Sequence, residues 1–166
     1  MSSVNSKVEA IREQLKHSSA SLYQLIDGPI AALPLNKLYQ APTEDEWTIM
    51  EILAHLVELM PYWADEVAKL VAQPGQNFGR LSQQEERLAA LRDHGHDGLE
   101  QVKAALPKSY RCLDQALSHL QGSDLTLTGH HMIFGERTLA WFIDELIVQH
   151  VHNHIVQMQE SLQALQ

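Results

Sequence analysis

The sequence IVQHVHNHIVQMQ, from Ile147 to Gln159, is the most informative part of this chain. In an α-helix each residue turns the chain by about 100°, so His150 and His154 lie roughly 40° apart on one face. Gln157 follows on the same face one turn later. His152 points to nearly the opposite side and is expected to face solvent. The stretch therefore predicts a helix that presents two imidazoles on one side.

Imidazoles at positions i and i+4 of a helix can both bind one divalent ion, about 2.0–2.1 Å from each nitrogen. Two ligands rarely hold an ion, and a chain with ten histidines can also carry such a pair by chance. The candidate for a third ligand is His55. It lies beside Ile52 and Leu59 on a predicted helix, where a histidine is more often a hydrogen-bonded residue at the edge of the core.

Apolar residues recur at helical spacing in four long stretches, which predict helices. These are expected at about Ser6–Ile26, Thr48–Ala72, Asp97–Leu120 and from Thr138 to the C-terminus. Gly28-Pro29 is expected to end the first helix, and Pro107 to kink or divide the third. A shorter helical piece rich in Gln and Glu, at 81–91, reads as a solvated connector.

No strand pattern is visible, so the sequence predicts an all-α protein. The expected fold is an antiparallel four-helix bundle, with a short extra helix between the second and third long helices. With 166 residues, of which 45% are hydrophobic, the chain is long enough for one domain with a core, taken here as residues 1–166.

Charge and cysteine content exclude several classes of function. The formal net charge is -9 and the twelve Lys and Arg residues are scattered, so no nucleic-acid partner is expected. No apolar run approaches 18 residues, and the N-terminus has no apolar signal region, so no membrane partner is expected. The single cysteine, Cys112, allows no internal disulfide. The absence of a disulfide favours a reducing, cytoplasmic location. Because Cys112 lies in a helical stretch, it is not expected to act as a nucleophile.

Two further segments contain histidines. The sequence DHGHDG, at 93–98, has donors for a metal, but its glycines favour a loop and a helix cap. The segment QGSDLTLTGHHMIFGE, at 121–136, is expected to be a loop in which His130 and His131 are adjacent. Such a loop either overhangs a site or is a packed connector. In the second interpretation the residues tucked under the bundle are Met132, Ile133 and Phe134.

Two stretches resemble a known family. They are WTIMEILAHL, at 47–56, and GERTLAWFIDELIVQHVHNHIVQ, at 135–157. Both are similar to the DinB/YfiT superfamily of metal-binding four-helix bundles, and the resemblance spans nearly the whole chain. In that family a histidine of the second helix and an H-x-x-x-H pair of the last helix commonly hold a divalent ion. The resemblance therefore implies one metal site with the ligands His55, His150 and His154.

The same resemblance places Gln157 at the position of a glutamine that often follows the histidine pair. Val151 is a departure, because many relatives have an acid there. Three neutral nitrogens and open positions suit one divalent ion per chain, with zinc or nickel expected first and iron or manganese as alternatives. Such a site can acidify a bound water to a pKa of about 7, or hold a thiol as thiolate.

Two functional hypotheses follow from these observations. The first is a metal-dependent hydrolase or low-molecular-weight-thiol transferase that acts on a small-molecule substrate, with the loop carrying His130 and His131 at the mouth of the site. The resemblance implies these activities and does not choose between them. No catalytic residue beyond the ligands is identified.

The second hypothesis is a non-catalytic helical interaction protein with a structural metal. It is favoured by the absence of a correctly spaced glutamate beside the histidines. A second apolar strip on the last helix fits either a homodimer interface or burial of a central helix. The strip consists of Val148, Val151, Ile155 and Leu162. A homodimer is expected.

Overall fold

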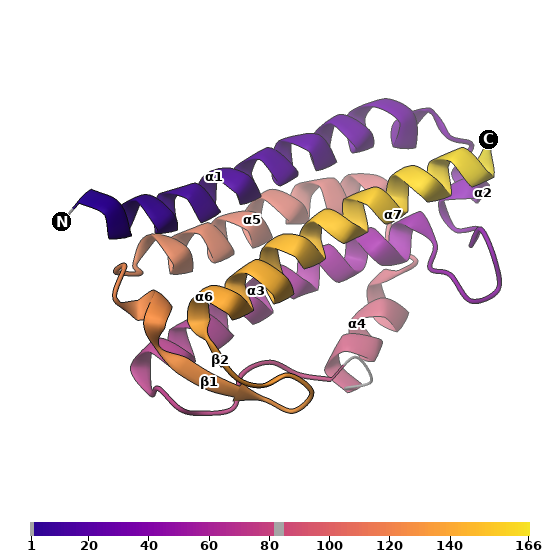
Figure 1. The fold of residues 1–166 in the computed structure, drawn as a ribbon. Coiled ribbons are helices and arrows are strands. Elements are labelled where there is room, and N and C mark those ends of the chain that lie inside the picture. Colours follow the sequence, from indigo (N-terminus) through magenta and orange to yellow (C-terminus); the bar gives the residue numbers. More distant parts are fainter. Residues whose placement is uncertain (1, 82–84) are drawn as a thin grey trace.

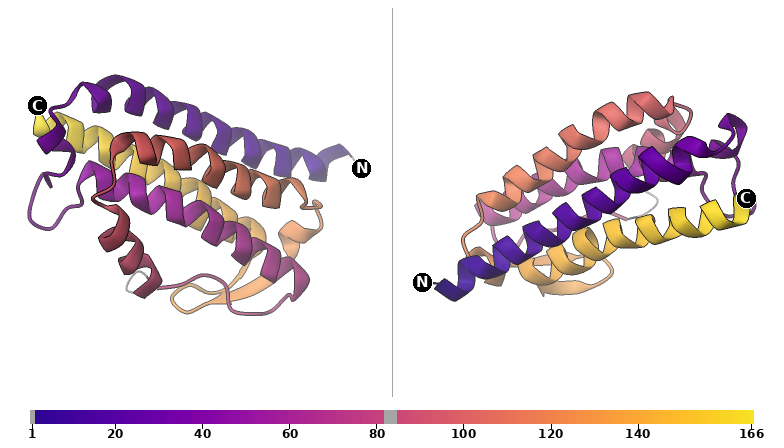
Figure 2. Two further views of the ribbon diagram at one scale, coloured as in Figure 1. Left: turned by 180° about the vertical axis from the view of Figure 1, so that it is seen from behind. Right: turned by 90° about the horizontal axis from the view of Figure 1, so that it is seen from above.

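The computed structural model describes residues 2–81 and 85–166. In this part of the chain four long helices form a bundle (Figure 1). They are α1 (Ser2–Leu25), α3 (Ile49–Ala72), α5 (Leu99–Ser118) and α7 (Gln149–Leu165). Helices α1 and α7 run in one direction and α3 and α5 in the other, as Figures 1 and 2 show. The predicted bundle is confirmed, and it brings α3 and α7 together as antiparallel neighbours.

The core is formed by one apolar side of each helix. On α3 the buried apolar residues recur at helical spacing, among them Leu56 and Trp63. The buried Ser109 of α5 is satisfied, because its hydroxyl donates to the carbonyl of Val57 at 2.8 Å. Burial of these apolar faces supplies the main stabilisation of the bundle and fixes the rotation of α3 about its axis.

Helix α1 ends at Leu25, close to the predicted end at Ile26, but the helical path does not stop at Gly28-Pro29. The chain passes through Gly28-Pro29 as a π-helical turn, η1 (Ile26–Ile30), and only then reaches the short helix α2 (Leu35–Leu38). Ile26 and Ile30 are fully buried, so packing holds this turn in a helical conformation despite the breaker residues. Likewise Pro107 lies inside α5 and does not divide it, because the helix stays packed on α3.

The short extra helix is also present, as α4 (Glu85–His94). It lies between α3 and α5 in the chain, as the sequence predicted. The expectation of no strands was wrong. After the 3-10 turn η2 (Asp124–Thr126), strand β1 (Thr128–His131) pairs antiparallel with β2 (Gly135–Thr138). Each strand has four residues, which is too short for an alternating pattern to be seen in the sequence.

The hairpin is attached to the segment that leaves α3. The backbone N–H of Gly75 donates to Thr128, and the N–H of Phe78 donates to His130, at 2.7 and 2.9 Å. These bonds hold the hairpin against one end of the bundle (Figure 1). The loop between the strands was predicted, in one interpretation, to be tucked under the bundle. That is wrong: Met132, Ile133 and Phe134 are 70%, 68% and 40% exposed, because they form the tip of the hairpin.

The last helix begins where the sequence predicted. The hydroxyl of Thr138 accepts the backbone N–H of Trp141, and α6 (Leu139–Phe142) leads through a π-helical segment, η3 (Ile143–Val148), into α7. A π-helical segment shifts the faces of a helix, and such segments are frequent at functional sites. Here it ends just before His150.

The second apolar strip of the last helix is covered by other helices of the same chain. Its members are 2–5% exposed, as expected for a central helix. The strip therefore does not supply the homodimer interface for which it was considered, and the homodimer stays a prediction. None of the described helices has the length and apolar character needed to cross a lipid bilayer.

Candidate metal centre

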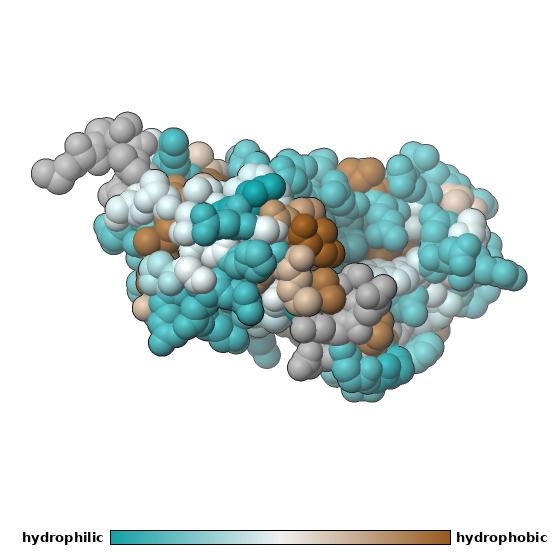
Figure 3. All heavy atoms as spheres, turned by 60° about the horizontal axis from the view of Figure 1, so that its bottom comes forward, coloured by the Kyte–Doolittle hydropathy of each residue, from teal (hydrophilic) through white to brown (hydrophobic). Residues whose placement is uncertain are grey.

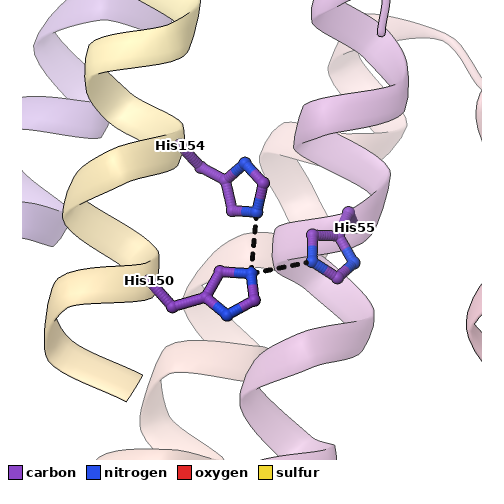
Figure 4. A group of neighbouring side chains, drawn as sticks. All are labelled: His55, His150 and His154. Carbon is purple, nitrogen blue, oxygen red and sulfur yellow. Dashed lines mark hydrogen bonds between the residues drawn. The ribbon is translucent and has the colours of Figure 1, made fainter. Parts of the chain in front are cut away.

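Three histidines from two helices point toward one another (Figure 4). His55 comes from α3, and His150 and His154 come from α7. The Nε2 atom of His150 lies 3.3 Å from Nε2 of His55 and 2.9 Å from Nε2 of His154. The structure thus brings together all three residues singled out from the sequence. Among the described residues this is the one group of three or more histidine, cysteine or acidic side chains spaced to hold an ion.

The spacing of the nitrogens fits a divalent ion. Ligands about 2.0–2.1 Å from a tetrahedral ion lie roughly 3.3–3.4 Å from one another. The two measured separations are 3.3 and 2.9 Å, and all three donor atoms lie within 4.8 Å of each other. Small movements of the imidazole rings are therefore enough to reach ligand geometry, without a change in either helix.

The protonation state of the rings also fits metal binding. Burial, followed by the charges of neighbouring groups, lowers the pKa of His55 to about 2 and that of His150 to about 4. Burial lowers the pKa of His154 as well, although its hydrogen bond to Gln157 acts in the opposite direction. All three imidazoles are therefore neutral at pH 7, which is the form that binds metals.

Gln157 orients one of the candidate ligands. Nδ1 of His154 lies 2.9 Å from Oε1 of Gln157. An amide oxygen can only accept, so Nδ1 of His154 carries the proton and donates it. The lone pair of a neutral His154 then lies on Nε2, which faces the other two histidines. This is the arrangement by which a second residue fixes the tautomer of a metal-binding histidine.

We expect Gln157→Ala to lower the affinity for zinc by about 10- to 100-fold, the usual cost of losing such an orienting partner. Competition with a chromophoric chelator measures this affinity. Gln159→Ala is the matched control, because Gln159 is an exposed glutamine on the same helix and should leave the affinity unchanged. Equal affinities for wild type and Gln157→Ala would show that the hydrogen bond does not orient a ligand.

On the other helix, the second ring nitrogen of His55 faces a carboxylate. Nδ1 of His55 is buried without a hydrogen bond, and Oε2 of Glu58 lies 3.8 Å away, beyond hydrogen-bond distance. The same Oε2 accepts a hydrogen bond from Arg80 at 2.5 Å. The nearby negative charge favours the tautomer with the proton on Nδ1, which leaves Nε2 of His55 available to a metal.

Trp47 packs against ligands from both helices. Its ring is stacked on His154, at 5.8 Å between centroids and 10° between planes, and meets His55 edge-on at 5.2 Å. The next residue, Thr48, caps α3 in a capping box with Glu51. The cap fixes where α3 begins and so holds Trp47 beside the histidines. The two neighbouring residues therefore have separate roles: Thr48 caps the helix, and Trp47 packs on the histidines.

A cavity of about 160 Å³ adjoins the histidines. His55 and His150 lie in its wall together with Arg80, Arg87 and His131. The rest of the wall is apolar and is formed by Leu59, Trp63, Leu81, Ile133, Phe134 and Leu146. The hairpin tip thus borders the cavity while remaining largely exposed. Figure 3 shows hydrophobic side chains gathered on this face of the molecule.

Of the adjacent pair on β1, His131 is buried and His130 is exposed. The backbone N–H of Ile133 donates to Nδ1 of His131 at 3.1 Å, so a neutral His131 carries its proton on Nε2. Gly79 allows this close packing: its φ is +82°, and a Cβ there would lie 2.9 Å from the His131 ring. The segment expected to be a loop is therefore a strand that builds one wall of the cavity.

The remaining sequence candidates lie outside the cluster. His152 is exposed, as the helical phase predicted. In DHGHDG, His94 ends α4 and contacts Asp97 at 2.8 Å, and the segment forms the expected connection to α5. Cys112 is exposed on α5. Val151, where relatives often have an acid, is buried among apolar side chains.

Sequence reasoning missed Arg80 and Arg87 and gave Trp47 no role. The stretch 81–91 read as a solvated connector, and this interpretation was wrong for Leu81 and Arg87, which line the cavity. An arginine among Gln and Glu residues looks like ordinary surface, so the sequence carries no signal for its position.

A four-helix bundle in which three neutral histidines from two helices converge beside a cavity defines a candidate metal-binding helical protein. The sequence model of the DinB superfamily matches residues 12–158, and the chain belongs to this superfamily. No protein with a curated description matches the chain.

Two solved structures share the fold. YfiT from Bacillus subtilis, described as a probable metal-dependent hydrolase with an unusual four-helix bundle topology, is 17% identical, with a TM-score of 0.75. The match covers 93% of this chain and 85% of YfiT. TT2238, described as a four-helix bundle protein, is 19% identical with a TM-score of 0.63, over 92% of this chain and 98% of that one. At these identities the likeness establishes the fold.

Proposed function

We propose that this protein is a metal-dependent enzyme, a hydrolase or a low-molecular-weight-thiol transferase, with a divalent ion held by His55, His150 and His154. The observation that carries the proposal is the convergence of three neutral imidazole nitrogens beside a largely apolar cavity, in whose wall His55 and His150 lie. The description of YfiT as a probable metal-dependent hydrolase supports the hydrolase. Zinc and nickel are the metals we expect first.

The surroundings of the ligands match this chemistry. Three protein ligands leave coordination positions open, and a metal bound there would acidify a water to a pKa of about 7 or hold a thiol as thiolate. Among the described residues no carboxylate lines the cavity, and Glu58 is engaged by Arg80. Carboxylates do line two other hollows beside the candidate ligands: Glu145 lies in one with His150 and His154, and Asp45 and Glu46 lie in the other with His154.

Purified protein should contain about one divalent ion per chain after expression with added zinc or nickel. Elemental analysis measures the metal, and a panel of ester hydrolysis and thiol-transfer assays tests for activity in the same preparation. The matched control is protein stripped by a chelator, which should be inactive and should recover on adding the metal. Protein without metal, whose melting temperature does not rise with zinc or nickel, would exclude the site.

The same preparation distinguishes the second candidate, a non-catalytic protein with a structural metal. The lack of a carboxylate in the described cavity wall favours this alternative. It predicts stoichiometric metal, no activity in either assay and unfolding when the metal is removed. An enzyme instead stays folded without metal and loses only its activity.

A further inference from the structure

Two arginines line the cavity beside the candidate ligands. The guanidinium of Arg80 lies 3.9 Å from the ring centroid of Tyr62, and its Nη2 donates to Glu58. The guanidinium of Arg87 lies 4.9 Å from the ring of Trp47, which is itself stacked on His154. Both arginines are therefore fixed by aromatic rings next to the histidines.

The charge of this cavity is opposite to that of the whole chain. The formal net charge of the protein is -9, yet the charged side chains among the described lining residues are Arg80 and Arg87, both positive, with Glu58 paired to Arg80 next to the wall. The two positive charges repel each other. A divalent cation bound to the neutral histidines would add further positive charge. Such a site, with apolar walls, attracts an anion and repels a cation.

The volume limits what the cavity can hold. A buried apolar cavity of about 150 Å³ holds one benzene molecule in another protein. The present cavity measures about 160 Å³, and most of the residues in its wall are apolar. A single ring or a short branched chain therefore fits, and a larger molecule has to extend past the hairpin tip.

We infer that the substrate is a small organic anion, a ring-sized apolar body bearing a carboxylate, and that Arg87 and Arg80 bind this carboxylate. The inference names the substrate class of the proposed metal site and so rests on the proposed function. A guanidinium that packs through its flat face directs its N–H groups sideways, where two carboxylate oxygens can accept them. Arg87 lies over Trp47 next to the histidines, and Arg80 also donates to Glu58.

The test compares benzoate with benzamide, which has the same ring and no charge. Calorimetry with metal-free wild-type protein should show benzoate binding about tenfold or more tightly than benzamide. Arg87→Gln should weaken the binding of benzoate by about the same factor and leave the binding of benzamide unchanged. Arg92→Gln is the matched control, since Arg92 is an exposed arginine of the same helix that pairs with Glu85. Arg87→Lys keeps the charge without the paired donors and should lose less affinity than Arg87→Gln.

Metal-free protein is used because a carboxylate can also bind a metal directly. Benzoate binding that appears only with zinc and is unaffected by Arg87→Gln overturns the inference, as does equal affinity for benzamide. Arginine-dependent benzoate binding in a protein that takes up no metal supports the inference and rejects the proposed function. If Arg87→Gln does not fold, the salt dependence of the wild-type protein provides the test. An affinity for benzoate that falls between about 20 and 500 mM salt supports binding by a positive charge, and an unchanged affinity overturns the inference.

Discussion

Replacing His154 with alanine is expected to remove most of the metal from the purified protein, whereas His152→Ala should leave the metal content unchanged. Nε2 of His154 lies 2.9 Å from Nε2 of His150, inside the cluster, while His152 is exposed on another side of the same helix. Loss of one of three ligands leaves two imidazoles, which rarely hold a divalent ion. Elemental analysis of both variants after identical expression in zinc-supplemented medium measures the difference.

The two variants control for one another, because each exchanges a histidine for alanine within three residues of α7. Circular dichroism should show the same helical content in both. Equal metal content in the two variants would mean that the orientation of α7 around His150 is not the one described. Loss of metal in His152→Ala alone would contradict the site completely.

The variant with alanine at His55, His150 and His154 together should fold as a helical bundle and have no hydrolytic or thiol-transfer activity. Helix α3 and the last helix pack through apolar side chains that do not depend on a metal, among them Leu56, Ile143 and Ile147. Alanine at the fully buried His55 leaves a small cavity, with a cost on the order of 1–3 kcal/mol, which a domain stable by about 5–15 kcal/mol tolerates.

Circular dichroism and thermal melting measure the fold of this variant, and the two assays measure its activity. Zinc at 100 times its dissociation constant should stabilise wild type by about 2.7 kcal/mol and have no effect on the variant. An unfolded triple variant would show that the metal is structural and would favour the non-catalytic alternative. A folded variant that keeps its activity would place the catalytic site elsewhere.

The helices and the histidine pair were predictable because the information is local. The spacing of four residues between His150 and His154 sets their common face through the helical period alone, and it also places His152 outside the site. The apolar stripe of α3 and the capping residue Thr48 act within one or two turns. The resemblance of these stretches to the DinB superfamily linked His55 to the pair, although the two segments are about 95 residues apart in the chain.

Features that depend on contacts between distant segments were decided only in the tertiary structure. Packing of Ile26 and Ile30 keeps Gly28-Pro29 helical, and pairing with the segment after α3 supports a hairpin too short to predict. The same contacts expose Phe134 at the hairpin tip.

The sequence by itself determined the bundle, the face shared by the histidine pair and the solvent exposure of His152, because helical period and apolar spacing are properties of neighbouring residues. The tertiary structure alone decided that Trp47, Arg80 and Arg87 lie around the histidines. The sequence around an arginine or tryptophan looks the same whether the side chain lies on a solvated surface or in a cavity wall. The difference arises from the segments that pack against it, and these are far away in the chain.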